Sequence, residues 1–331
     1  MYSINNTTYE YTINPNDIIN DVTFSSNINW GQGQLSLQLN LNWDDTNISV
    51  GKIIKLYEND ENTPSWQLIY TGIIQRLVRT LDVSSENITL EAIGLGGALS
   101  FLYYYDSSYA FNKTGEPATL IGGIITYFTT KYSGLISAWT LTSYWTNADI
   151  DFDYTSCLDW ITQLKEASDQ RFFIDQNGTL DFKEIPTTPT HYLTVAVDVE
   201  RIVVPEDILE LTNKYILEYD GGTNPYIDAT SQTNYWLREL KDVKTELGNS
   251  TSADSVGNNY ISKYKDPLKK ITVTVNSNYD IETIKPWHTI KVRNSAYAIN
   301  NLQIYRTTYT VDKIILELEQ IDNLTQQIIN S

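Results

Sequence analysis

The feature that most constrains the fold of this chain is a strict alternation of apolar and polar residues from Leu35 to Trp43. Leucine or tryptophan stands at every odd position of this segment, and serine, glutamine or asparagine at every even one. A period of two places the two kinds of side chain on opposite faces of an extended strand. The segment therefore predicts a strand with one buried face, and it excludes a helix, whose period is about 3.6 residues.

More strand-like segments surround this one. Gly31 and Gly33 predict a turn that leads from a strand at Phe24–Trp30 into the alternating strand, because glycine adopts turn conformations without steric cost. Three further strands are expected at Lys52–Tyr57, Trp66–Arg79 and Asn87–Ile93. Five or more short strands at this spacing are typical of a barrel or a sandwich.

The middle of the chain has a different pattern. Pro117 precedes apolar residues at helical spacing, and a second helix is expected from about Thr155. Asn177 and Gly178 stand between two apolar runs, which is a strong signal for a β-hairpin. We therefore expect an inserted α+β unit over residues 105–204.

Strands are expected again toward the C-terminus. One strand ends at Gly221 and Gly222, and a helix follows from about Ala253. Pro286 is expected to fix the turn before a strand at Thr289. A final hairpin is expected from Leu302–Thr310 and Lys313–Glu319. The expected fold class is thus mainly β with an inserted α+β unit.

The composition excludes several classes of protein. The chain has 23 basic and 41 acidic residues, a formal net charge of −18, which disfavours nucleic-acid binding through phosphates. Cys157 has no partner for a disulfide within the chain, and one cysteine with two histidines is too few for a structural Cys-His zinc site. No apolar run approaches the ~20 residues of a membrane-spanning helix, and the first residues show no secretory signal.

The sequence contains few candidates for catalytic residues. No known nucleophile, metal or phosphate-loop motif is present, so we expect no enzyme activity, no cofactor and no metal site. His191 and His288 lie far apart in the sequence and belong to no ligand motif. Cys157 is expected to be buried and inert.

Two acidic segments allow two interpretations each. Asp149, Asp151 and Asp153 would share one face of an extended strand. Two of these carboxylates could act as the catalytic pair of a glycosidase. We favour the other interpretation, in which they form a charged strand edge that resists aggregation. The segment Asp175–Asp181 resembles part of a calcium loop. The twelfth position of such a loop is a glutamate, but here it is Pro186, so a hairpin is the better interpretation.

The 24 tyrosines and 8 tryptophans also allow two interpretations. They can stack on sugars, or they can fill β cores and subunit interfaces, where aromatic residues are enriched. Packing is favoured because these residues are spread over the whole chain. A carbohydrate-binding or receptor-binding tail component is kept as the alternative function.

Three segments in this order resemble the baseplate hub, or tail hub, proteins of tailed bacteriophages. This group includes late-control-type proteins, tail-associated hub proteins and the front half of type VI spike proteins. The first segment is Phe24–Leu41, which is followed by Ile69–Leu77 and Ile88–Ser100. The second is Asp207–Gly222 with the loop after it, and the third is the block from Ala253 through the final hairpin. At Pro286 the sequence Pro-Trp-His departs from the Pro-Gly-Asp often seen in the family.

The resemblance implies a specific architecture. Each subunit would have two β-barrel-like tube domains, and a trimer would form a pseudo-hexameric ring that matches the six-fold tail tube. The first barrel would take residues 1–104, completed by 205–240, and the second barrel, with a short helix, would take 241–331. Residues 105–204 would be the inserted peripheral domain.

The implied function is structural. A homotrimeric hub would join the tail tube to the tip and let DNA pass through its lumen without specific binding. The implied partners are further copies of the chain, the tail tube or distal tail protein, and spike, fibre or other baseplate proteins. The implied location is the virion tail, assembled in the host bacterial cytoplasm, and no lytic activity is implied because no lytic domain is recognised.

Overall fold

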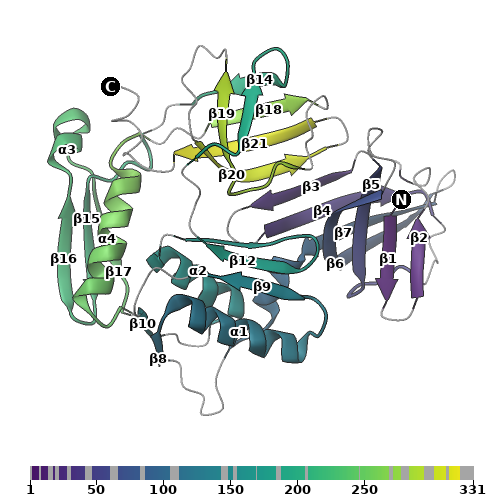
Figure 1. Cartoon of the computed structure of the whole chain (residues 1–331), viewed down its shortest axis with the longest axis horizontal. Helices are drawn as coiled ribbons and strands as arrows, with labels where there is room; N and C mark the ends of the chain where they lie inside the picture. Colours follow the sequence, from purple (N-terminus) through teal and green to yellow (C-terminus); the bar gives the residue numbers. More distant parts are fainter. Residues whose placement is uncertain are drawn as a thin grey trace.

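The fold is mainly β in the computed structural model, and a large curled sheet dominates it (Figure 1). The structure describes residues 2–6, 9–13, 18, 22–27, 31–41, 47–59, 66–82, 86–104, 112–142, 148–151, 155–168, 170–183, 188–205, 208–245, 247–267, 271–276, 283–293, 302–310 and 313–320. Within these residues no helix is long and apolar enough to cross a membrane.

Thirteen strands form the large sheet. Its N-terminal strands are β1 (Tyr2–Asn6), β2 (Tyr9–Ile13), β3 (Thr23–Asn27), β4 (Gly31–Leu39), β5 (Ile53–Asn59), β6 (Trp66–Leu81) and β7 (Glu86–Gly94). Its C-terminal strands are β13 (His191–Thr194), β14 (Val199–Val203), β18 (Ile271–Asn276), β19 (Thr289–Arg293), β20 (Leu302–Tyr309) and β21 (Lys313–Gln320). The main path is β14-β18-β21-β20-β3-β4-β7-β6-β5-β1-β2, and β13 pairs with β19, which pairs with β20.

Strands from the two ends of the chain meet inside this sheet. β3 pairs antiparallel with β20, so hydrogen bonds join the N-terminal and C-terminal strands. Figure 1 shows these purple and yellow strands next to each other. The sheet is therefore continuous, and its division into two barrel-like domains stays a prediction.

The alternation expected around Leu35 is confirmed in β4. Leu35, Leu37 and Leu39 are fully buried, while Gln34 and Ser36 are exposed. The three leucines belong to a core that also contains apolar residues of β18 and β21. Each fully buried leucine stabilises the fold by roughly 1.5–3 kcal/mol relative to an exposed one, so both halves of the sheet share one source of stability.

The inserted unit follows β7 and lies beside the large sheet (Figure 1). Its elements are the 3-10 helix η2 (Leu95–Phe101), β8 (Asn112–Gly115), α1 (Pro117–Lys131), β9 (Ala138–Leu141), β10 (Ala148–Asp151), α2 (Cys157–Ser168), β11 (Arg171–Ile174) and β12 (Thr179–Lys183). Pro117 begins α1 as predicted, and Ile121, Ile124 and Phe128 are buried in one core with residues of α2. β11 and β12 form a hairpin, and β9 pairs with β12 in parallel.

A third unit differs from the expected domain boundaries. β15 (Lys214–Tyr219) pairs with β16 (Gly222–Ile227) and β17 (Glu239–Val243) in a separate sheet, next to α3 (Ala229–Tyr235) and α4 (Ser250–Tyr264). Among the described strands, residues 205–240 thus do not complete the first barrel. The reason is that the apolar face of β15 is already covered: Tyr215 and Leu217 pack with Ala253 of α4.

The end of the inserted unit also differs from the expectation. β13 and β14 fall inside the range 105–204, yet they pair with β19 and β18 of the large sheet. The pairing of β13 with β19 is parallel and connects segments almost 100 residues apart. Within the described strands, the sheets of the inserted unit therefore end at β12.

Candidate functional site

The hairpin β11–β12 connects the inserted unit to the large sheet. Gly31, the first residue of β4, lies against the backbone of Ile174 at the end of β11. A Cβ atom on Gly31 would lie 2.1 Å from the Ile174 carbonyl oxygen, closer than any side chain allows, and Gly31 also has a φ of +94°. Both the contact and the backbone conformation thus require glycine at this position.

The tip of this hairpin holds Asn177 and Gly178, as expected from the sequence. Gly178 has a φ of +76°. The Asp175 carboxylate accepts hydrogen bonds from the backbone N–H groups of Asn177 (2.9 Å) and Thr179 (2.8 Å). The aspartate that suggested a calcium loop therefore closes a turn with its own backbone.

The other glycines expected in turns lie in two places, inside β4 and between β15 and β16. Gly31 and Gly33 lie inside β4 rather than in the turn before it, and residues 28–30 are outside the described residues. Gly33 permits a close approach as well, because a Cβ there would lie 2.5 Å from the Ser25 hydroxyl. Gly221 and Gly222 connect β15 to β16, and of the two it is Gly222 that has a positive φ, +143°.

Pro286 lies in a tight turn whose third residue, Trp287, has an unusual backbone conformation. The backbone N–H of His288 donates to the Lys285 carbonyl over 3.1 Å, and Trp287 has a φ of +76°. In a turn with proline at the second position, a positive φ at the third position favours glycine. A tryptophan here is strained by roughly 1–3 kcal/mol, so its side chain must contribute packing elsewhere.

The Trp287 ring packs against β11. Its centroid is 3.7 Å from that of Phe173, and the Arg171 guanidinium lies 5.0 Å from the ring. Phe173 and Arg171 share one face of the strand because they are two residues apart. The hairpin that contacts β4 through Ile174 is thus also held by the C-terminal part of the sheet.

The two histidines, which the sequence places far apart, meet beside this turn. Nε2 of His191 lies 2.7 Å from Nδ1 of His288, and the same Nδ1 accepts the backbone N–H of Lys285 over 3.2 Å. Because a backbone N–H can only donate, His191 is the donor in the pair and Nδ1 of His288 carries no proton. No spacing rule could have found this pair, since β13 and β19 bring the residues together.

Burial keeps this pair neutral. It lowers the pKa of both histidines, and together with the smaller effects of His191, Arg171 and Lys285 it brings the pKa of His288 to about 3. Protonation of His288 at Nδ1 would break both hydrogen bonds that it accepts. The pair thus fits a structural role at neutral pH.

The described residues contain no recognisable catalytic centre. No three His, Cys, Asp or Glu side chains gather there as metal ligands. Cys157 is fully buried, and burial raises its pKa to about 12, so its thiol stays protonated. The expectation from the row of Asp149, Asp151 and Asp153 cannot be followed, because Asp153 lies outside the described residues.

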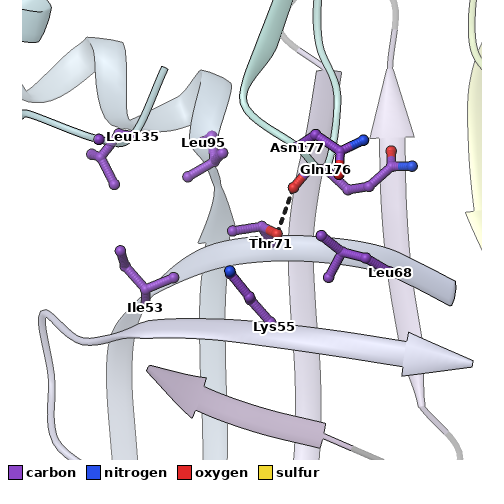
Figure 2. A pocket seen from close by; sticks show the side chains of 9 residues that line it. Ile53, Lys55, Leu68, Thr71, Leu95, Leu135, Gln176 and Asn177 are labelled. Atoms are coloured by element: carbon purple, nitrogen blue, oxygen red, sulfur yellow. Dashed lines mark hydrogen bonds between the residues drawn. The ribbon is translucent and has the colours of Figure 1, made fainter. Parts of the chain in front are cut away.

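A pocket of about 290 Å³ opens at the seam between β5–β6 and the inserted unit (Figure 2). Figure 2 shows the hydrogen bond that closes one side of it: the Thr71 hydroxyl donates to the Gln176 carbonyl over 2.6 Å. Thr71 is itself held by Gln32, whose side-chain oxygen accepts the Thr71 N–H over 2.8 Å. The pocket is lined by Ile53, Lys55, Leu68, Thr71, Leu95, Gly134, Leu135, Gln176 and Asn177.

Trp236, directly after α3, is the most exposed tryptophan of the described residues, at 80%. It has a φ of +61°. Asn213, which is fully buried, holds the loop on both sides of it: the side-chain amide donates to the Trp236 carbonyl (2.6 Å) and accepts the Arg238 N–H (2.8 Å). The exposed ring is thus presented by a fixed backbone.

The most exposed aromatic side chains of the described residues lie apart from one another. The described aromatic side chains with the largest exposure are Trp66, Tyr103, Trp139, Tyr192 and Trp236. They stand on different elements, and no ring contact joins any two of them within the described part of the chain.

Comparison with known proteins gives matches by structure. No family model and no curated protein sequence matches this chain. The 43 kDa tail protein of prophage MuSo2 from Shewanella oneidensis is 13% identical, with a TM-score of 0.70 over 97% of this chain and 98% of that one. A tail protein from Neisseria meningitidis is also 13% identical, with a TM-score of 0.71 over 96% of each chain.

A third match comes from a secretion system. The c3393 protein of E. coli, a component of the type VI secretion system described as similar to the phage T4 tail proteins gp27 and gp5, is 9% identical. Its TM-score is 0.54, over 91% of this chain and 73% of that one. The chain therefore has the fold of phage tail proteins, as its resemblance to the baseplate hub family implied.

Proposed function

We propose that this protein is a structural hub of the tail or baseplate of a tailed phage or phage-derived particle. The observation that carries the proposal is the extent of the structural match, which spans nearly the full length of both this chain and two tail proteins. A match of this extent includes the large sheet together with both attached units. A tail component of this kind needs interfaces rather than catalytic groups.

In the proposed assembly three copies form a ring. The N-terminal strands β1–β7 and the C-terminal strands β13, β14 and β18–β21 are two barrel-like parts of each subunit. Six such parts then surround one channel with pseudo-six-fold symmetry, matching a tail tube. Among the described strands, β14 and β2 are the ends of the sheet path, and sheet edges of this kind favour contacts between subunits.

The proposed ring joins the tube to the tip and allows DNA through. Each copy carries a net charge of −18, and like charges repel DNA over about one Debye length, ~8 Å at physiological salt. The DNA would thus pass without sticking to the wall. The proposed partners are the tail tube or distal tail protein and spike, fibre or other baseplate proteins, and the proposed location is the virion tail.

Electron microscopy of the purified full-length protein tests the proposal. We expect three-fold symmetric rings with an open centre, and no retention of double-stranded DNA in a gel-shift assay at physiological salt. Compact particles without a channel would contradict the hub assignment. Rings that bind DNA tightly would contradict the proposed passage of DNA but would still support the three-fold assembly.

A further inference from the structure

Strand β17 is one edge of the separate three-stranded sheet that Figure 1 shows beside the rest of the fold. Among the described strands it pairs with β15 alone, in parallel. Leu240 and Val243 on this strand are 40% and 53% exposed. The opposite edge strand, β16, carries Pro225, and proline is typical of an edge that does not pair further. β17 contains no proline, so its backbone is able to pair with another strand.

The backbone groups of β17 alternate between β15 and the free edge. The Lys214 N–H donates to the Arg238 carbonyl over 3.0 Å. In a parallel ladder every second residue of a strand bonds to the same neighbour, so the even-numbered residues of β17 bond to β15. The N–H and C=O groups of Glu239 and Lys241 therefore point to the free edge.

One register allows this edge to pair with the same edge of a second copy. A two-fold axis between two antiparallel strands places the residue on the axis opposite its own counterpart. With the axis at Leu240, the two leucines meet. Glu239 then lies opposite Lys241 of the second copy, and these two residues have the backbone groups that point outward. Arg238 lies opposite Asp242 in the same way.

The neighbouring registers bring like charges together. An axis at Glu239, Lys241 or Asp242 would place that charged residue opposite itself, and like charges directly opposite each other destabilise a sheet. Pairing an odd-numbered residue with an even-numbered one would join opposite faces of the strands. A lysine in the middle of an edge strand usually prevents pairing, but in the Leu240 register it meets a glutamate.

Charges on β15 extend the same pattern across the sheet. Lys214 pairs with Glu239 at 2.5 Å, and Lys241 pairs with Glu218 at 2.6 Å, both on the face that α4 does not cover. When Glu239 of one copy meets Lys241 of the other, the four side chains form a row of alternating sign across both sheets. A network of this kind stabilises more than isolated surface pairs do.

We propose that β17 of two copies pairs antiparallel about Leu240 and joins their three-stranded sheets into one. The net charge of −18 on each copy opposes this association, but residues 238–244 hold three basic and two acidic residues, so the acidic excess lies elsewhere. One short strand of each copy takes part, and the contact therefore belongs to the small, weak class. The inference goes beyond the proposed function, because three copies in a ring have no two-fold axis between them and the contact would join two rings.

Cysteine crosslinking of the full-length protein tests the register. Leu240→Cys should give a disulfide-linked homodimer under mild oxidation, because such a pair has Cα atoms ~4.5 Å apart and disulfides span ~4.4–6.8 Å. Glu239→Cys alone and Lys241→Cys alone should give none, since each would be a diagonal neighbour of its counterpart, ~7–8 Å away. A mixture of these two variants should crosslink. The native Cys157 is fully buried.

Sedimentation velocity over a range of concentrations is the second measurement. Leu240→Lys places two like charges on the axis and should raise the dissociation constant of this contact roughly tenfold. The matched control is Ile227→Lys, which adds the same charge to β16 at a position that is 54% exposed, and it should leave the association unchanged. Circular dichroism spectra like that of the unchanged protein would show that both variants fold.

The outcomes separate this inference from the hub assignment. Absence of the Leu240→Cys crosslink, or equal crosslinking at all three positions, would overturn the inference. So would an association that Leu240→Lys leaves unchanged. These results leave the hub proposal intact, because the ring of three does not require this edge. A protein that crosslinks at Leu240→Cys as expected but forms no ring would overturn the hub assignment and support the contact.

Discussion

Phe24 and Tyr309 stack face to face across the line where the two ends of the chain meet. Their ring centroids are 4.5 Å apart at an interplanar angle of 14°, and the two residues are cross-strand partners on β3 and β20. Tyr70 of β6 lies 5.4 Å from Phe24, and the Tyr309 hydroxyl donates to the Ile284 carbonyl over 2.5 Å. This cluster fastens the N-terminal strands to the C-terminal ones.

Replacing Tyr309 by alanine should destabilise the whole large sheet. We expect a loss of about 3 kcal/mol, the usual cost of removing a buried aromatic ring. Because both halves share one core, urea unfolding should still show one transition for the sheet. The control is Tyr192→Ala, which removes a half-exposed ring and should change stability much less. A variant in which the N-terminal strands keep the original stability would contradict the shared core.

Gly31 gives a prediction with a close control. Gly31→Ala must move the β11–β12 hairpin away from β4, because the new Cβ would collide with the carbonyl oxygen of Ile174. Gly51 also has a positive φ, +86°, but no atom lies within 4 Å of its Cβ position. Gly51→Ala should therefore cost only about 1 kcal/mol of backbone strain, and Gly31→Ala clearly more.

Limited proteolysis can locate the effect of Gly31→Ala. We expect faster cleavage in the β11–β12 hairpin of this variant than of the Gly51→Ala protein. Equal stability and equal cleavage of the two variants would show that the contact with Ile174 is not needed.

Trp287 is predicted to stabilise the fold in spite of its backbone. Trp287→Gly removes the strain of the positive φ but also the ring that contacts Arg171 and Phe173. Loss of the ring should dominate, with a net destabilisation of about 1–3 kcal/mol. Thermal unfolding measures this directly, and a more stable glycine variant would show that strain outweighs packing.

The histidine pair makes stability depend on pH. The folded pKa of His288, about 3, lies below the unfolded value of about 6.5. Between these values the unfolded chain binds more protons, so stability falls as pH drops from about 6.5 toward 3 and is full above 6.5.

The His288→Gln variant isolates this contribution from that of the carboxylates. Over the same pH range, the free energy of unfolding of this variant should depend less on pH than that of the unchanged protein. The slope should be smaller by up to about 1.4 kcal/mol per pH unit. Urea titrations between pH 7 and pH 5 are the measurement. Parallel curves for the two proteins would mean that His288 does not titrate as the burial of the pair requires.

Local patterns predicted the local elements well. The alternation at Leu35, the proline before α1 and the asparagine-glycine pair at 177 each act through a few neighbouring residues, and each gave an element close to its observed position. These signals depend on periodicity and turn chemistry, which are properties of short segments.

The partners of the strands could not be predicted in the same way. An alternation of apolar and polar residues indicates which face of a strand is buried, but it does not indicate which strand lies beside it. The pairing of β3 with β20 and the meeting of His191 with His288 therefore had no sequence signal. The family resemblance implied that residues 205–240 complete the first barrel. The strand pattern of β15 could not correct this, since it fits any sheet and its covering helix, α4, comes later in the chain.

The proposed ring contains three copies of this chain, and native mass spectrometry of the protein counts them. We expect a dominant species of three chain masses. A single-chain mass at every concentration, and also in assembled particles, would contradict it.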